Sequence, residues 1–228
     1  MKGKKVLLVI AAHPDDEVLG CGATVAKYVD LGFAANILIL GEGVTSRYQD
    51  REKADFSKVK SLQREAQLAA KVLGVKRLFL ENLPDNRFDS VPLLDIIKKI
   101  EKIKNIIKPD IVFTHHGLDL NIDHQITCRA TVTAFRPCRG NTQHIYGFEI
   151  PDFKGWGAFR GSAFIPDYFV DVHGYLDKKL QALKFYASEL KKYPHPRSLK
   201  IVKSLAEYRG SFCARKQAEA FNTLLSIN

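Results

Sequence analysis

Residues 6–17 have the sequence VLLVIAAHPDDE, an apolar run that meets a cluster of polar residues. The run Val6–Ile10 contains only valine, leucine and isoleucine, which is typical of a central parallel strand buried on both faces. Asp16 and Glu17 follow it, and acidic residues suit the first turn of a helix. This pattern predicts an α/β fold whose first strand lies inside the sheet.

The alternation of apolar strand and amphipathic helix continues along the chain. Further strands are expected at Ala35–Leu40, Leu78–Leu80, Ile111–Thr114 and Phe169–Val172, and helices at 17–32, Leu62–Leu73, Leu93–Ile107 and 176–190, with a final helical pair ending at Ile227. Strand–helix units in this order imply right-handed crossovers. We therefore expect an α/β fold with a Rossmann-like, doubly wound, mostly parallel sheet. The length of 228 residues fits a single domain, 1–228.

Polar side chains gather where three of the expected strands end. His13 follows the first strand, Glu42–Arg47 the second, and His115–His124 the fourth. In doubly wound sheets, ligands bind beyond the carboxyl ends of the strands. The three clusters are therefore expected to meet in space.

The first and last clusters have the composition of a metal site. His13 and Asp16 are common zinc or iron ligands, and a catalytic zinc usually takes three protein ligands and leaves one position for water. His124 is the best candidate for the third ligand. Asp15 lies between the first two, and a carboxylate beside a metal-bound water can take a proton from it.

These motifs resemble those of the PIG-L/LmbE family of zinc-dependent N-acetylsugar deacetylases. The resemblance rests on HPDDE at 13–17, NIDH at 121–124, Arg209-Gly210 and AEAF at 218–221, and it runs nearly end to end. It implies hydrolysis of the acetamide of an N-acetylated amino sugar or sugar conjugate, which releases acetate and the free amine.

The resemblance also implies roles for individual residues. His13, Asp16 and His124 would hold one Zn²⁺ per chain, with another divalent metal such as Fe²⁺ as the alternative, and Asp15 would be the general base. The predicted substrate-binding residues are Arg47, Asn121 and Asp123.

Asn121 departs from the pattern of many family members, which have a histidine three positions before the last ligand. Asparagine can donate a hydrogen bond to an oxyanion, but it cannot protonate a leaving amine. Either Asp15 performs both proton transfers, or His115, His116 or His173 supplies the second.

The four cysteines form no CxxC pair, which indicates reduced thiols in a cytoplasmic protein. Cys128 lies one helical turn after His124 and is either a fourth ligand or, as is more usual, a small buried hydrophobe. The segment 136–168 is rich in glycine and aromatic residues. Trp156 and its neighbours are expected to border the substrate pocket, and the alternative is an edge strand with a long surface turn.

Charge and hydropathy limit the partners. The net charge of +10 is spread over helices without an arginine-rich block, so we expect no nucleic acid, and the excess favours an anionic substrate. No apolar run approaches about 20 residues, so no transmembrane segment is expected. The short N-terminal apolar run meets His13-Pro14 where a signal peptide would need a cleavage site. The oligomeric state stays open.

Three other function classes are compatible with parts of the sequence. Gly20-Cys21-Gly22 approaches a dinucleotide-binding fingerprint, but Val25 stands where its third glycine should be. A non-catalytic module could keep the fold and bind a sugar or a protein. Two histidines and one carboxylate also describe iron(II) oxygenases.

Overall fold

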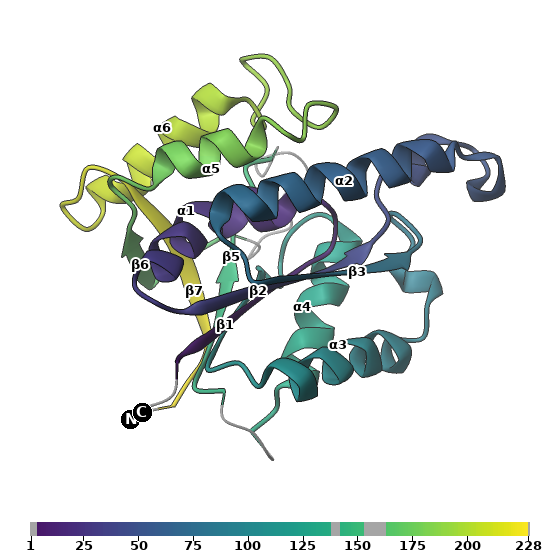
Figure 1. The fold of residues 1–228 in the computed structure, drawn as a ribbon, viewed down its shortest axis with the longest axis horizontal. Coiled ribbons are helices and arrows are strands. Elements are labelled where there is room, and N and C mark those ends of the chain that lie inside the picture. The colour runs from purple at the N-terminus through teal and green to yellow at the C-terminus, as the bar shows by residue number, and fades with distance from the viewer. Residues whose placement is uncertain (1–3, 138–141, 153–162, 228) are drawn as a thin grey trace.

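The computed structural model describes residues 4–137, 142–152 and 163–227, which form one seven-stranded sheet with helices on both faces (Figure 1). The strands are β1 (Val6–Ala11), β2 (Ala34–Gly41), β3 (Arg77–Leu83), β4 (Ile111–His115), β5 (His144–Phe148), β6 (Tyr168–Asp171) and β7 (Ala218–Ser226). Their order is β3-β2-β1-β4-β5-β7-β6. Neighbours from β3 to β5 pair in parallel, and β7 runs antiparallel to β5 and β6. The predicted mostly parallel sheet is confirmed.

The helices divide between the two faces of the sheet. They are α1 (Asp16–Asp30), α2 (Phe56–Leu73), α3 (Leu93–Ile107), α4 (Ile122–Ala134), α5 (Leu176–Leu183) and α6 (Leu199–Ser211). In Figure 1, α1, α2, α5 and α6 lie on one side of the sheet and α3 and α4 on the other. Each face has its own apolar core, and β1 contributes to both because its side chains alternate between them. The doubly wound arrangement is therefore confirmed.

Helix α1 is interrupted one and a half turns after it begins. Cys21 has non-helical backbone angles (φ −147°, ψ 21°), so the hydrogen-bond ladder of the helix breaks there. Gly20 lies beside this break, and a Cβ atom at Gly20 would come within 2.3 Å of the ring of Phe148 on β5. The glycine is required because the helix approaches the sheet so closely.

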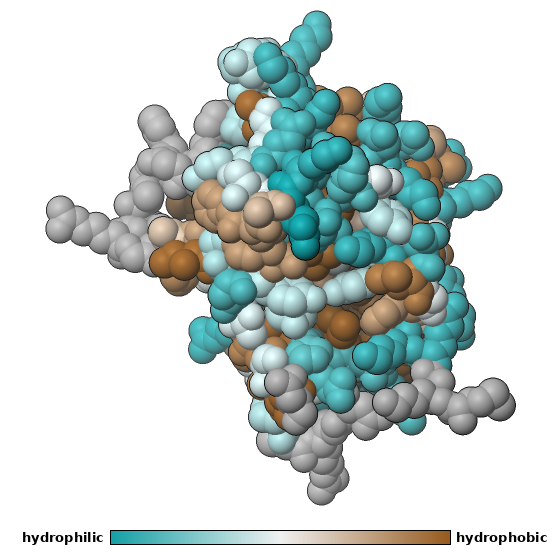
Figure 2. Space-filling model, turned by 90° about the vertical axis from the view of Figure 1, so that its left-hand side faces the viewer, coloured by the Kyte–Doolittle hydropathy of each residue, from teal (hydrophilic) through white to brown (hydrophobic). Residues whose placement is uncertain are grey.

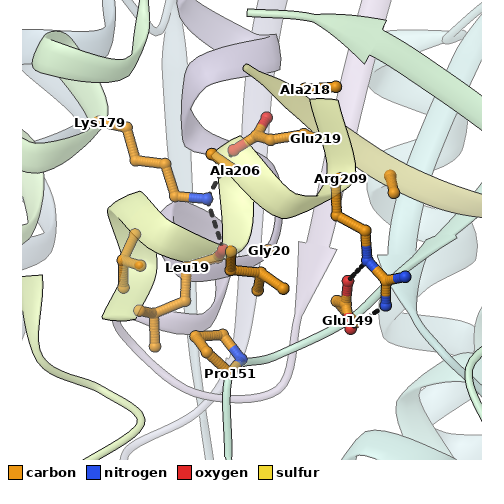
Figure 3. A pocket seen from close by; sticks show the side chains of 12 residues that line it. Leu19, Gly20, Glu149, Pro151, Lys179, Ala206, Arg209, Ala218 and Glu219 are labelled. Carbon is orange, nitrogen blue, oxygen red and sulfur yellow. Dashed lines mark hydrogen bonds and ion pairs between the residues drawn. The ribbon is translucent and has the colours of Figure 1, made fainter. Parts of the chain in front are cut away.

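A buried ion pair satisfies the groups that the interruption of α1 exposes (Figure 3). The ammonium group of Lys179 on α5 donates to the carbonyl of Leu19 at 2.7 Å and to Glu219 on β7 at 2.6 Å. The carboxylate of Glu219 accepts the backbone N–H groups of Ala23 and Thr24 at 3.2 and 2.6 Å. Two elements from the second half of the chain thus hold the kinked helix together.

The end of the chain differs from the prediction. A final helical pair was expected, but α6 is followed by strand β7, which lies between β5 and β6. Alanine, glutamate and leucine dominate residues 218–226, and these residues favour helices in isolation. Backbone pairing on both sides outweighs that preference, since strand propensity depends mainly on packing context.

Two further segments were also predicted incorrectly. The alternative for 136–168 was an edge strand, but β5 is an inner strand between β4 and β7. The helix expected over 176–190 ends at Leu183, and the following residues form turns that bury Tyr186. Periodicity could not show this, because Ala187 and Leu190 keep the helical spacing beyond the end of the helix.

None of the helices in the described parts of the chain is long and apolar enough to cross a membrane. Figure 2 shows the face that carries β6, where hydrophilic residues predominate among the coloured residues and hydrophobic ones form small groups.

Candidate metal centre

The predicted site lies at the carboxyl ends of the parallel strands, where neighbouring crossovers diverge. In the strand order, β1 and β4 are neighbours although they are far apart in sequence. The helices that follow these two strands, α1 and α4, lie on opposite faces of the sheet (Figure 1). Such a position is the topological switch point at which doubly wound sheets bind ligands. Residues 12–16 after β1 and 116–124 after β4 therefore face each other, as predicted.

His13, Asp16 and His124 form a cluster that could hold a metal ion, with one ligand atom of each within 4.8 Å of the others. Oδ2 of Asp16 lies 3.3 Å from Nδ1 of His13 and 3.1 Å from Nε2 of His124. Asp16 is fully buried at the start of α1, and its Oδ2 also accepts the backbone N–H of His13 at 3.0 Å. Two imidazoles and one carboxylate are a donor set that suits zinc and iron(II).

Acidic side chains hold each imidazole from behind. Nε2 of His13 lies 2.9 Å from Asp123 and 3.3 Å from Asp85, so its other nitrogen is directed at Asp16. Nδ1 of His124 lies 3.3 Å from Asp119, and its Nε2 is directed at Asp16. A carboxylate behind a histidine fixes the tautomer and ring orientation that a metal ligand needs.

These carboxylates also shift the proton affinity of both rings. Burial alone would lower the pKa of His13, but hydrogen bonds to Asp123 and Asp16 outweigh it and raise the pKa to about 10. Burial likewise opposes the effects of Asp16 and Asp119 at His124, whose pKa rises to about 9. The surroundings therefore favour positive charge at this position, carried either by protons or by a cation.

Polar atoms at the centre of the cluster without hydrogen-bond partners among the described residues indicate that this positive charge is a bound cation. Oδ1 of Asp16 and Nε2 of His124 are buried, and neither has a hydrogen-bond partner of good geometry among the residues that the structure describes. Buried polar atoms without a partner are costly, so they usually mark a bound ion or water. The residues present fit a divalent metal.

Asp15 lies between two of these ligands and has an unusual backbone. Its φ of 104° is in the left-handed region, which residues other than glycine rarely adopt. The carboxylate is buried, and Nη1 of Arg197 lies 3.3 Å from its Oδ2. Burial raises the pKa of Asp15 well above its usual range, and the charge of Arg197 opposes that rise. A carboxyl with raised proton affinity is suited to act as a base.

The loop of residues 42–47 after β2 contacts the site through a different residue from the one predicted. Arg47 has a side chain that is 51% exposed and pairs with Glu189 at 2.6 Å. Its neighbour Ser46 instead donates its backbone N–H and its hydroxyl to Asp85, which lies behind His13. Ser46, rather than Arg47, connects this loop with the cluster of possible ligands.

Asn121 and Asp123 are both engaged with protein groups. Asn121 caps α4, where its Oδ1 accepts the backbone N–H groups of Asp123 and His124, and its amide nitrogen donates to Asn86. Asp123 is fully buried and accepts the backbone N–H groups of Asn86 and Phe88 besides facing His13. In this conformation both residues support the site from within.

The three histidines considered for a second proton transfer differ in position. His115 is fully buried and stacks on His124, with ring centroids 3.9 Å apart. Its Nε2 accepts the backbone N–H of Ala12, and burial and His124 lower its pKa well below the usual value. His116 contacts Asn222 on β7, and His173 is exposed in the turn after β6. A neutral His115 is a poor proton donor.

Cys128, the possible fourth ligand, is buried in α4. Burial raises its pKa to about 11, and it is not among the possible metal ligands of the described residues. These properties favour the buried hydrophobe. Trp156, expected at the border of the substrate pocket, lies outside the described residues.

Two residues at the site had no prediction. Asp85 follows β3, which was expected to end at Leu80 but extends to Leu83. Applying the strand-end rule to this third strand would have found it. Arg197 precedes α6 and gave no local signal, because only the tertiary fold brings it to Asp15.

A separate small pocket of about 20 Å³ lies between α1, α6 and β7 (Figure 3). Its lining includes the pair of Lys179 and Glu219 and a second pair, Arg209 and Glu149, with N···O distances of 2.6 Å in both. Because these charged side chains are paired with each other, they are not available to a ligand, and we interpret the pocket as a packing defect between the elements.

Comparison with known proteins places the chain in a family. The profile of the PIG-L family, described as GlcNAc-PI de-N-acetylase, matches residues 8–135, which include every proposed metal ligand. The chain belongs to the PIG-L family. The resemblance noted from the sequence is thereby confirmed.

Several relatives of this PIG-L chain are named as deacetylases. It is 34% identical over 193 residues to "Uncharacterized deacetylase YaiS" of Escherichia coli (strain K12), covering 81% of this chain and 92% of the relative. It is 24% identical to "Diacetylchitobiose deacetylase" of Thermococcus kodakarensis, covering 98% and 84%. Deacetylases are amide hydrolases, so the predicted enzyme class is confirmed at the level of the family.

Solved structures share the fold over almost the whole PIG-L chain. An N,N'-diacetylchitobiose deacetylase from Pyrococcus horikoshii matches with a TM-score of 0.76 and 20% identity, covering 98% of this chain and 85% of that one. A 4-carboxy-2-hydroxymuconate hydratase from Pseudomonas putida KT2440 matches with the same TM-score and 21% identity, covering 98% of both. The fold alone therefore does not determine the reaction.

Proposed function

We propose that the protein hydrolyses the acetamide of an N-acetylated amino sugar or sugar conjugate with the help of one bound Zn²⁺. The observation that supports this most directly is the convergence of His13, Asp16 and His124 on one point, beside the buried carboxylate of Asp15. Two imidazoles and one carboxylate suit both zinc and iron(II); zinc is proposed because it is the usual ion of hydrolytic sites with these ligands, and iron(II) is the alternative metal.

His13, Asp16 and His124 would hold the ion. When bound, the ion supplies a Lewis acid that polarises the amide carbonyl and makes a water molecule more acidic. The buried carboxylates behind the two imidazoles keep both rings oriented toward it.

Asp15 is proposed to carry out both proton transfers. It first takes a proton from the water that attacks the carbonyl carbon, and it then returns that proton to the nitrogen as the C–N bond breaks. This sequence gives acetic acid and the free amine, and the proton of the acid then passes to the amine or to water to leave acetate, so atoms and charge balance. Asp15 is preferred over His115 for the second transfer, since His115 is neutral and its Nε2 is occupied by a backbone N–H.

Substrate contacts are proposed at the rim of the site. Arg47 is half exposed, and the amide nitrogen of Asn121 is bonded only to Asn86 among the described residues. Arg47 can turn toward a substrate if it leaves Glu189, and the amide nitrogen of Asn121 can donate to a substrate in place of Asn86 while its Oδ1 keeps the cap of α4. Asp123 is proposed to act through His13 rather than by touching the sugar, because its carboxylate is fully buried.

The arrangement of α1 argues against the dinucleotide-binding alternative. That function requires backbone N–H groups at a helix N-terminus to bind the pyrophosphate. Gly20-Cys21-Gly22 instead lies inside α1, and the N–H groups of Ala23 and Thr24 are taken by Glu219.

The proposed function is tested by measuring acetate release from a panel of N-acetylated sugars and sugar conjugates. The protein is loaded with Zn²⁺ or Fe²⁺, and metal content is measured in parallel. We expect one metal ion per chain and acetate release from at least one substrate. Bound metal without acetate release from any of them would contradict the proposal, and hydration of an unsaturated acid would favour hydratase chemistry instead.

Arg197→Gln is expected to shift the pH dependence of the reaction. The charge of Arg197 lowers the pKa of Asp15, so its removal raises that pKa and leaves less of the ionised base at acidic pH. The acidic limb of kcat/KM should therefore move to higher pH, with a several-fold loss at pH 6 and a smaller loss at pH 8. Arg215→Gln removes the same charge from an exposed pair with Asp171 and should leave the limb in place. Equal profiles for both variants would refute this role of Arg197.

A further inference from the structure

The left-handed backbone of Asp15 has to be held by its surroundings. A residue with a side chain at φ 104° persists there only where neighbouring contacts fix it. On one side, the carbonyl of Asp15 accepts the N–H groups of Val18 and Leu19 at 3.1 and 2.8 Å, which are the first bonds of α1. The N–H of Asp15 needs a partner on the other side.

Glu17 provides that partner. Its Oε2 accepts the N–H of Asp15 at 3.1 Å. A glutamate that reaches back to the N–H at a helix start is known from capping boxes, and here it does so from two residues further along the chain. Glu17 is 1% exposed, so the orientation of its carboxylate depends on protein contacts.

Tyr186 provides the contact that fixes Glu17. Its hydroxyl donates to Oε1 of Glu17 at 2.5 Å, and the whole side chain is buried. The turn after α5 brings it there, because α5 packs against α1 (Figure 1). A phenylalanine ring would fill almost the same volume, so the distinct contribution of the hydroxyl is this one hydrogen bond.

We propose that Tyr186 is a positioning residue for the catalytic base and that it acts through Glu17 on the backbone of Asp15. The inference rests on the proposed function, because it assigns a further residue to the same reaction. Without the hydroxyl, the carboxylate of Glu17 is free to rotate, and the N–H of Asp15 loses its fixed acceptor. The carboxylate of Asp15 then spends part of its time outside the geometry that proton transfer requires.

Tyr186→Phe tests this role. Displacements of about 1 Å at a reacting group can lower the rate a hundredfold, so we expect kcat to fall about tenfold or more. KM should stay within about twofold and metal content should not change, because substrate contacts and metal ligands remain. Tyr28→Phe is the matched control. Tyr28 lies further along α1, and the change removes the contact of its hydroxyl with that of Tyr168 on β6. It should leave kcat unchanged.

Measuring Tyr186→Phe in a Glu17→Gln protein as well as in the wild type distinguishes a positioning role from a general loss of stability. If Tyr186 acts only through Glu17, then Tyr186→Phe should lower kcat by less than about twofold in a Glu17→Gln protein. If the two substitutions lower kcat independently, so that their effects multiply in the double variant, the proposal is wrong. A folded Tyr186→Phe protein with wild-type kcat would also overturn it.

Amide hydrogen exchange keeps the inference separate from the proposed function. Tyr186→Phe and Glu17→Gln should each accelerate exchange at the Asp15 N–H, whereas Tyr28→Phe should not. This result does not depend on acetate release. A wild-type protein without acetate release would end the proposed function, and unchanged exchange at Asp15 would end the inference about Tyr186.

Discussion

Replacing Asp15 with asparagine is expected to lower kcat about a thousandfold or more while the metal stays bound. General acid–base catalysis usually contributes 10²–10⁴-fold, and the upper part of that range applies because one group serves both proton transfers. Asparagine keeps the size of the side chain but cannot accept the proton. His13, Asp16 and His124 are untouched, so metal content should equal that of the wild type.

Asp16→Asn is the informative comparison for this experiment. It changes the neighbouring carboxylate in the same chemical way, but it removes a ligand, so metal content and activity should fall together. Asp89→Asn, at an exposed position, should change neither. Near-wild-type rates in Asp15→Asn would show that another group is the base.

Replacing Lys179 with methionine is expected to destabilise the protein by about 3–5 kcal/mol, because it leaves Glu219 buried without its counter-charge. Both side chains of the pair are almost fully buried, so water cannot take over the lost contact. The free energy of unfolding from urea denaturation measures the effect.

The double variant Lys179→Met with Glu219→Gln should recover part of that loss. A neutral glutamine needs no counter-charge, and its carbonyl oxygen can still accept the N–H groups of Ala23 and Thr24. Lys203→Met is the control, since Lys203 faces Glu207 in an exposed pair 3.9 Å apart and should cost less than about 1 kcal/mol. A similar loss in both lysine variants would contradict the role assigned to the buried pair.

The sequence was sufficient to predict the parts of the fold that follow from local pattern. The first four strands are short apolar runs, and the rule that ligands bind at strand ends correctly predicts that His13 and His124 meet. The convergence of His13, Asp16 and His124 was predictable because each of them lies directly after a strand or at a helix start, where the topology fixes its position.

The support of the site was not predictable in the same way. Arg197 and Tyr186 lie in turns, and β7 consists of residues that favour helices. Their positions depend on contacts between segments that are distant in the sequence, and neither periodicity nor spacing carries that information. Asp85 is intermediate, since a correct end for β3 would have revealed it.

The bond between Glu219 and the interrupted helix α1 has a consequence for biogenesis. The ribosome delivers His13 and Asp16 early and His124 only after half of the chain, and the helix that carries Asp16 is held by β7, which comes much later in the sequence. The proposed metal site would therefore be complete only after β7 has been synthesised, so metal binding at that site would follow folding of the domain.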